Sequence, residues 1–383
     1  MRLVRWKPIR GGRLAGPAAL VLLVVACSGS PTADRGAGTA SEGATAAGGE
    51  SGAALQEVYA AVEGLTGDER RQKLLELAEE EGAEVSFYTT FALEEAEPVI
   101  AEFEEDTDIT VDVYRAPSSS FMQRVLREAE AGFAGSDVVS SNGTEMVLLE
   151  DEGLLAPLET PMDDDLPESY LQSERWAPNY LNVFTPAWNT NAVSPEEAPE
   201  AWDEVLKAEN LSLEITDGAW FMELVTYFRQ EHGMSEEEAI ALFEQASDGA
   251  IMIDGHSVQN ELLAGGEFDV AAATYMHRSM QFVNDGAPVA WEPAVEPMIA
   301  SPNGIGIHRD ASRPATALLF IEYMLTDSQE LMGELGRTPV FADAPSGTGE
   351  YEVIVLDTNR YGEERQKWDD LYDGIVGGGE PAS

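Results

Sequence analysis

Polar side chains stand at the ends of two expected strands, where they could contact a small ligand. Tyr88 and Thr89 close the first strand, and Ser141 and Asn142 close the third. Because the carboxyl ends of parallel strands meet at one edge of a sheet, we expect these side chains to converge on a binding site. For Tyr88 and Thr89 the alternative is a buried ring beside a hydroxyl that caps the next turn.

Two expected helix starts could present backbone N–H groups to an anion. Ser118 and Ser119 follow a proline and open one helix, whereas Asp217, Gly218 and Ala219 open another. Free N–H groups at a helix start bind anionic groups well. The serines could equally serve as ordinary N-caps, and we expect Asp217 itself to cap its helix.

A tyrosine, a histidine and an arginine lie close together where a later strand is expected to end. Tyr275 and His277 could offer an oxygen and a nitrogen to a metal ion. Arg278 could hold an anionic ligand through two hydrogen bonds, or could form a solvent-facing salt bridge. The other histidines lack ligand spacing, and we expect them on the surface: His232, His256 and His308.

The composition excludes several partners and chemistries. The 383-residue chain has a formal charge of −49, and such a field repels nucleic acid and anionic lipid. The acids are spread along the chain, which is typical of a surface adapted to salt. A single cysteine excludes a disulfide framework and a cysteine zinc cluster. The sequence has no zinc-protease helix, phosphate-binding loop or complete nucleophile elbow, so we expect no enzyme.

The first residues have the layout of a secretory signal. Residues 1–13 carry five positive charges and no acids, and an apolar run follows at 14–26. The run is too short for a membrane helix. Its ending before Cys27 resembles the lipobox of bacterial lipoproteins, which implies cleavage after residue 26 and a diacylglyceryl group on the Cys27 sulfur. Residues 27–54 are small and polar, and we expect a disordered tether there.

Strands alternate with helices through the rest of the chain, which predicts parallel βαβ units and an α/β fold. A helical extension is expected at 55–83, where Thr66 and Glu69 fit a capping box. Continuous helices are expected at 313–332 and 351–374. The expected strands lie at 85–90, 109–114, 137–142, 213–215, 268–274 and 304–307, with an extended segment at 286–300.

The order of these elements resembles that of bacterial extracellular solute-binding proteins of the two-lobe kind, closest to the ferric-iron-binding branch. The resemblance covers about 84–375, and Asn189 lies in a segment similar to the first crossover between the lobes. It implies a type II periplasmic-binding-protein fold, with a ligand held between two lobes joined by a hinge of crossing strands. The segments that carry it are 85–90, 111–115, 188–193, 286–289, 302–307 and 336–340. The implied lobes are 84–186 plus 292–340, and 187–291 plus 341–378.

In the ferric branch two adjacent tyrosines hold the iron, but here the matching pair reads Tyr275-Met276. A thioether is a soft ligand that gives hard ferric iron little. The resemblance implies ferric iron as the ligand. The lost tyrosine and the serine-rich helix starts favour the alternative, a small organic or phosphonate-type anion. No resident cofactor is expected.

The resemblance also implies a role and partners. It implies a lipid-anchored receptor on the extracytoplasmic face of the cell membrane, which delivers its solute to an ABC permease and the associated ATPase. A sensor that reports to a membrane kinase would have the same sequence features. A secreted enzyme is the rival from another class, and turnover of ester, glycoside or phosphate substrates would support it.

Overall fold

The computed structural model describes residues 44–161, 166, 170–340 and 351–377. The expected signal segment, Cys27 and the first part of the expected tether lie outside these residues. Helix α1, Ala44–Val62, begins before the expected end of the tether, so the boundary at residue 54 is wrong. Alanine is the strongest helix former, and Leu55 and Val58 on this helix are buried. None of the described helices is both long and apolar enough to cross a membrane.

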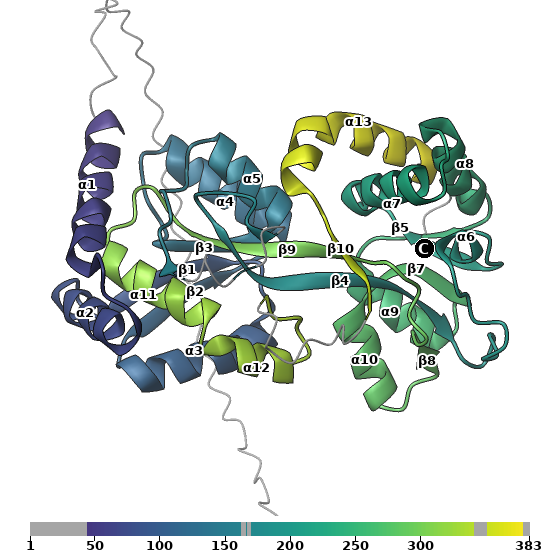
Figure 1. Ribbon diagram of the computed structural model, residues 1–383, viewed down its shortest axis with the longest axis horizontal. Helices are drawn as coiled ribbons and strands as arrows, with labels where there is room; N and C mark the ends of the chain where they lie inside the picture. The colour runs from purple at the N-terminus through teal and green to yellow at the C-terminus, as the bar shows by residue number, and fades with distance from the viewer. Residues whose placement is uncertain (1–43, 162–165, 167–169, 341–350, 378–383) are drawn as a thin grey trace, which may run out of the picture. The chain divides into compact units, whose positions relative to one another are not determined.

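In the described residues, ten strands form one mixed sheet (Figure 1). The path runs β2-β1-β3-β9-β4-β7-β5-β6, with β10 paired to β9 and β8 paired to β4. β1 pairs in parallel with β2 and β3, and β5 pairs in parallel with β6 and β7, as the alternation of elements predicted. The strands are β1 Glu84–Thr89, β2 Thr110–Arg115, β3 Val138–Asn142, β4 Ala177–Asn189, β5 Leu211–Glu214, β6 Ile251–Ile253, β7 Val270–Tyr275, β8 Val289–Ala290, β9 Met298–Ile307 and β10 Val353–Val355.

The two long strands β4 and β9 connect the parallel parts of the sheet. They pair antiparallel in the middle of the sheet, and every residue of both is buried. Tyr180 of β4 belongs to the apolar cluster around β1, whereas Phe184 of the same strand belongs to the cluster around β5. Likewise, Ile305 and Ile299 of β9 belong to these two clusters in turn. The same two strands therefore cross from one core to the other.

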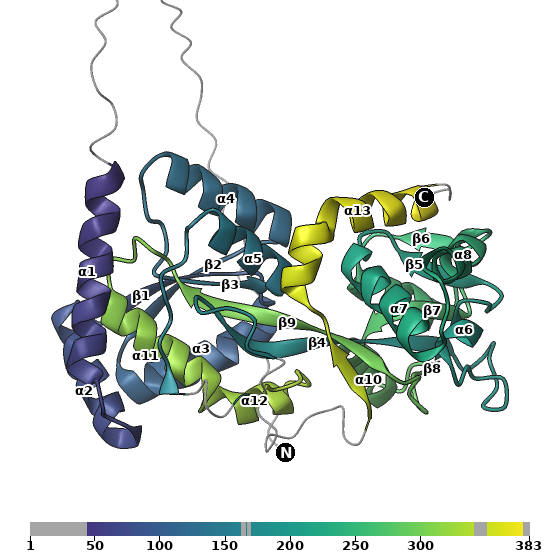
Figure 2. The ribbon, with the colours of Figure 1, turned by 45° about the horizontal axis from the view of Figure 1, so that its top comes forward.

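Helices cover the sheet on both sides of this crossing (Figures 1 and 2). We call the part around β2-β1-β3 the β1 half and the part around β7-β5-β6 the β7 half. The β1 half has α3 Leu93–Thr107, α4 Ser118–Glu130, α5 Gly143–Asp151, α11 Pro314–Leu325 and α12 Ser328–Glu334. The β7 half has α6 Trp202–Val205, α7 Gly218–Glu231, α8 Glu236–Ser247, α9 His256–Gly265 and α10 Met276–Asn284. The last helix, α13 Thr358–Val376, contacts α5 of one half and α7 of the other.

Two of the expected helices differ from those in the structure. The helix expected at 313–332 is two helices, because the chain leaves helical geometry at Thr326, where φ is −127° and ψ is −87°. The helix expected at 351–374 begins only at Thr358, because Val353–Val355 pair with β9 instead. Residues 353–355 form a strand because they pair with β9, which lies far away in the sequence. A local sequence pattern contains no information about such a partner.

The helices α1 and α2, Gly67–Glu80, are part of the β1 half. The Tyr59 hydroxyl donates to the Pro157 carbonyl at 2.8 Å, and Arg70 pairs with Glu322 of α11 at 2.7 Å. The capping box expected at Thr66 is wrong, since the Thr66 side chain accepts no bond from the helix. The chain enters the helix through Gly67, whose φ is +53°. A capping box requires helical φ at the residue after the N-cap, so this backbone turn is incompatible with it.

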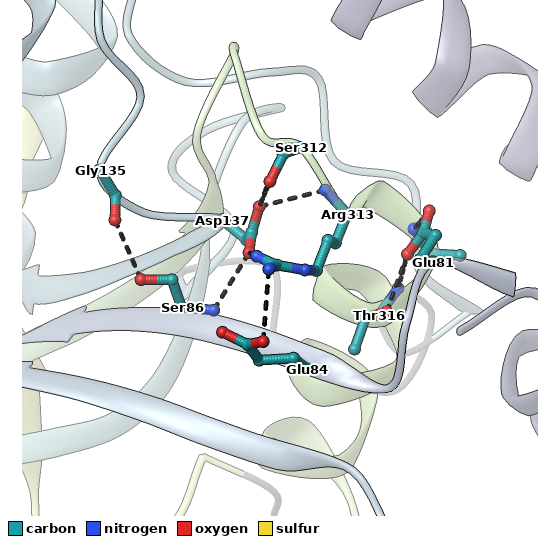
Figure 3. Close-up of polar contacts among 9 residues, drawn as sticks. Glu81, Glu84, Ser86, Gly135, Asp137, Ser312, Arg313 and Thr316 are labelled. Carbon is teal, nitrogen blue, oxygen red and sulfur yellow. Dashed lines mark hydrogen bonds and ion pairs between the residues drawn. The ribbon is translucent and has the colours of Figure 1, made fainter. Parts of the chain in front are cut away.

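Asp137 is a buried acceptor that ties three elements of the β1 half together (Figure 3). Its carboxylate accepts from the backbone N–H of Ser86 on β1 and from the backbone N–H groups of Ser312 and Arg313, all between 2.8 and 3.1 Å. The Ser312 hydroxyl and the Arg313 guanidinium also donate to it. Beside it, Glu81 accepts from the first N–H groups of α11 at 2.9 Å and so caps that helix from outside.

We expect Asp137→Ala to lower the free energy of unfolding by about 3–5 kcal/mol, because it leaves several buried donors without an acceptor. Urea unfolding followed by tryptophan fluorescence measures this loss. Asp112→Ala, at an exposed position of β2, is the matched control and should change the value by less than about 0.5 kcal/mol. Equal effects of the two substitutions would show that the Asp137 contacts do not hold the half together.

Candidate functional site

A group of polar side chains lies at the carboxyl ends of three strands in the β7 half. Glu214 ends β5, Tyr275 ends β7, and His256 follows β6 after one short turn. Asp217 precedes α7, the helix that follows β5. The oxygen and nitrogen atoms of Glu214, Asp217 and His256 lie within 4.8 Å of one another, and all three residues are buried. In open α/β sheets, ligands bind at this edge.

His256 is held as a cation by two acceptors. Its Nδ1 lies 2.9 Å from the Ala273 carbonyl oxygen, and its Nε2 lies 3.0 Å from Asp217 Oδ1. Since both partners accept, both ring nitrogens donate. Burial lowers the pKa of His256, but the charge and hydrogen bond of Asp217, with the nearby charge of Glu214, raise it to about 9.

The expectation that His256 and His308 lie on the surface is therefore wrong. His256 is 8% exposed and His308 is 3% exposed, whereas His232 is exposed as expected. Asp217 lies 39 positions before His256 in the chain, so nothing next to His256 in the sequence indicates the partner that makes its burial favourable.

The Glu214 carboxylate already accepts several hydrogen bonds from neighbouring residues. It accepts from the Thr216 N–H at 2.5 Å, from the Thr216 hydroxyl at 2.8 Å and from the Gly255 N–H at 3.0 Å. Gly255 has φ of +100°, a conformation that L side chains rarely adopt, and this turn delivers its N–H to the carboxylate. Burial and then the Asp217 charge raise the pKa of Glu214. Glu214 thus fixes the ends of β5 and β6 relative to each other.

Asp217 does not cap its helix, so that expectation is wrong. It occupies the N-cap position of α7, but its side chain accepts no bond from the helix and pairs with His256 instead. Its second oxygen, Oδ2, is buried and has no hydrogen-bond partner among the described residues. Gly218 lies beneath α13, where a Cβ would come within 2.4 Å of Asp369, and Ala219 packs half-buried on the core.

Tyr275 lies between two histidine rings. Its ring centroid is 4.5 Å from that of His256 and 5.4 Å from that of His277. Burial and then the Asp217 charge raise the pKa of Tyr275 well above its usual value. Burial, followed by the charges of Arg337 and Arg278, lowers the pKa of His277. Both side chains are therefore neutral near pH 7.

Met276, at the position of the expected second phenolate, has its side chain in the interior. The residue is 1% exposed and belongs to an apolar cluster. It offers no oxygen to a ligand at this edge.

The β1 half contributes a chain of hydrogen bonds at the start of α4 and α5. The Asn142 amide donates to the Ser118 hydroxyl at 3.2 Å and accepts from the Asn182 amide at 3.4 Å. Arg337 donates to Asn182 at 2.8 Å and pairs with Glu95. Ser119 is exposed beside Ser118, and the Ser141 and Thr90 hydroxyls lie 3.4 Å apart.

The two halves come close to each other at Gly336 and His277. A Cβ placed on Gly336 would lie 3.8 Å from the Cβ of His277. The Arg337 charge also acts on both Tyr275 and His277. The structure thus brings Arg337 of one half near Tyr275 and His277 of the other. Hydrogen bonds through Asn182 and Asn142 connect Arg337 to Ser118.

Four of the expected contact residues are engaged elsewhere. The Tyr88 hydroxyl donates to Glu128 at 3.3 Å, beneath Arg124, and the Thr89 hydroxyl accepts from the Phe91 N–H at 2.9 Å. Asn189 donates to the Leu263 carbonyl and accepts from the Asn191 N–H, which closes a turn. Arg278 donates to Gln281 at the surface. Four residues of this region were not expected from the sequence to belong to the site: Asn182, Glu214, His256 and Arg337.

Comparisons with known proteins relate this arrangement to binding proteins. The family described as bacterial extracellular solute-binding protein matches residues 93–330. A search of curated protein sequences finds no match. Similar solved structures include the apo ferric ion-binding protein A of Pasteurella haemolytica (17% identity, TM-score 0.64, covering 77% of this chain and 98% of that chain).

Two further structures have the same fold. The periplasmic binding protein P5PA is 18% identical with a TM-score of 0.63, and 77% of this chain and 99% of that chain are covered. The Atu4243–GABA receptor is 14% identical with a TM-score of 0.64, and 78% and 99% are covered. The expected type II periplasmic-binding-protein fold is confirmed. At these identities the likeness concerns the fold alone.

The His256 pair should make stability depend on pH. The folded-state pKa of about 9 lies above the unfolded value of 6.5, so the stabilisation is complete below pH 6.5 and is lost as the pH rises through 9. The loss is on the order of 3 kcal/mol. Urea unfolding across this range measures it, and His256→Gln should remove most of the decrease. An unchanged pH dependence in the variant would contradict the charged state of His256.

Proposed function

The chain belongs to the family of bacterial extracellular solute-binding proteins, and from this premise we propose that it captures a small solute outside the cell and delivers it to an ABC permease. One observation supports this best: Gly336 and Arg337 of the β1 half lie close to His277 and Tyr275 of the β7 half, next to the polar groups of both halves. A ligand that contacts both groups would favour closure of the halves about the crossing strands β4 and β9. We place the lobes at 84–186 plus 292–340 and 187–291 plus 341–378. The proposal contains no catalytic step.

A small organic solute fits this site better than bare ferric iron. Ferric iron binds anionic oxygen, but burial raises the pKa of both phenols at this edge, Tyr275 and Tyr372, so both stay protonated. Met276 supplies only a thioether, and it lies in the core. An organic solute instead requires individual donors and acceptors, which both groups supply.

Ferric iron with an accompanying anion is the second candidate. It is favoured by the proximity of Glu214, Asp217 and His256, whose ligating atoms lie within 4.8 Å of one another beside Tyr275. To bind iron, His256 would first have to lose a proton and its bond to Asp217.

Ferric citrate separates the two candidates. If the ligand is organic, adding ferric citrate to the full-length protein in detergent should produce no visible ferric–phenolate absorption band. Tyr275→Phe is the control, because it removes the phenol that packs against His256. A coloured band in the natural protein that is lost in Tyr275→Phe would establish iron instead.

The location of the protein is a further part of the proposal. We propose that Cys27 carries the lipid and that the following residues connect it to α1, so the binding domain lies outside the cytoplasmic membrane. In cells fed a labelled fatty acid, the chain should incorporate the label, and Cys27→Ala should not. Incorporation that persists in Cys27→Ala would contradict anchoring at this residue.

A further inference from the structure

One carboxylate oxygen of Asp217, at the edge of the sheet where a ligand would bind, lacks a hydrogen-bond donor among the described residues. The residue is 6% exposed, and its Oδ1 pairs with His256 at 3.0 Å. Its Oδ2 is buried and receives no hydrogen bond from any described residue. Leaving a buried carboxylate oxygen without a donor is costly, so native structures seldom do so without a reason.

The charges around Asp217 favour a positively charged group at this oxygen. Two buried carboxylates, Asp217 and Glu214, face a single imidazolium, His256. In the described residues His256 is the only ion-pair partner of Asp217. The Asp217 charge acts on Tyr275, whose ring packs on His256 and on Phe184. A cation that bonded to Oδ2 could also contact this aromatic ring.

A protonated amine fits the open position better than a metal ion. A metal ion needs several ligand atoms, but both nitrogens of His256 already donate to acceptors, and Glu214 already accepts from Thr216 and Gly255. One open carboxylate oxygen beside a phenol is sufficient for an ammonium group, which needs separate acceptors and no proton loss from the protein.

We propose that Asp217 Oδ2 receives the protonated amino group of the transported solute. The solute is therefore an amine-bearing small molecule. This inference rests on the proposed function and adds to it the class of solute.

The experiment compares amines with the matched compounds that lack the amino group. The probes are 4-aminobutanoate, 5-aminopentanoate and putrescine, against butanoate, pentanoate and butane-1,4-diol, at constant ionic strength. The melting temperature of the full-length protein in detergent is measured with each. At saturating concentration at least one amine should raise it by about 3 °C or more, and its matched compound should not.

Two variants test the assignment to Asp217. Asp217→Asn keeps the shape but replaces the charged acceptor, and it should weaken binding of the amine at least about tenfold. Glu223→Gln is the control, a buried carboxylate on the same helix that accepts from the Asp357 N–H, and binding should be unchanged. Circular dichroism without ligand establishes that both variants are folded.

Several outcomes would overturn the inference. An equal shift with the matched compound, an equal shift with sodium or potassium chloride alone, or unchanged affinity in Asp217→Asn would each do so. So would the absence of any shift with all three amines, which would leave Oδ2 to an ordered water. If ferric citrate or an anion without an amine is bound while Asp217→Asn has no effect, the inference fails and the proposed function stands.

Discussion

The antiparallel pairing of β4 with β9 is the constraint on which the rest of the structure depends. These strands are buried along their whole length and contribute side chains to both apolar cores. Because β4 and β9 pair with each other across the junction, the strands of both halves belong to one continuous sheet. They also place the carboxyl ends of the parallel strands of each half toward the same region. The contact of Gly336 with His277 is a consequence of that arrangement.

The polar groups at this junction differ in how completely they are satisfied. In the β1 half, Asn142, Asn182 and Arg337 form a continuous chain of hydrogen bonds. In the β7 half, Glu214 is saturated, but Asp217 keeps one oxygen open. Such a difference is what a preorganised site requires, because the saturated groups hold the geometry and the open ones remain for the solute. The acidity of the chain does not oppose an amine as it would an anion.

The sequence predicts the fold far better than the contacts within the site. Alternating strands and helices are local patterns, so the parallel units around β1 and β5 could be predicted. The burial of His256 depends on Asp217, and the internal bond of Tyr88 depends on Glu128, so both follow from tertiary contacts. The start of α1 at Ala44 was missed because its residues are small and resemble a tether. The starts of α4 and α7 were located correctly, but not what the Asp217 side chain at the start of α7 contacts.

The central claim is that the two halves close on a solute held at their junction. The most direct measurement is the distance between spin labels on Glu130→Cys of α4 and Glu261→Cys of α9, both at exposed positions, in a Cys27→Ser background. The account predicts that an amine which raises the melting temperature also produces a shorter distance, and that Asp217→Asn abolishes this change. A distance that stays the same while the amine is bound would contradict closure of the halves over the solute.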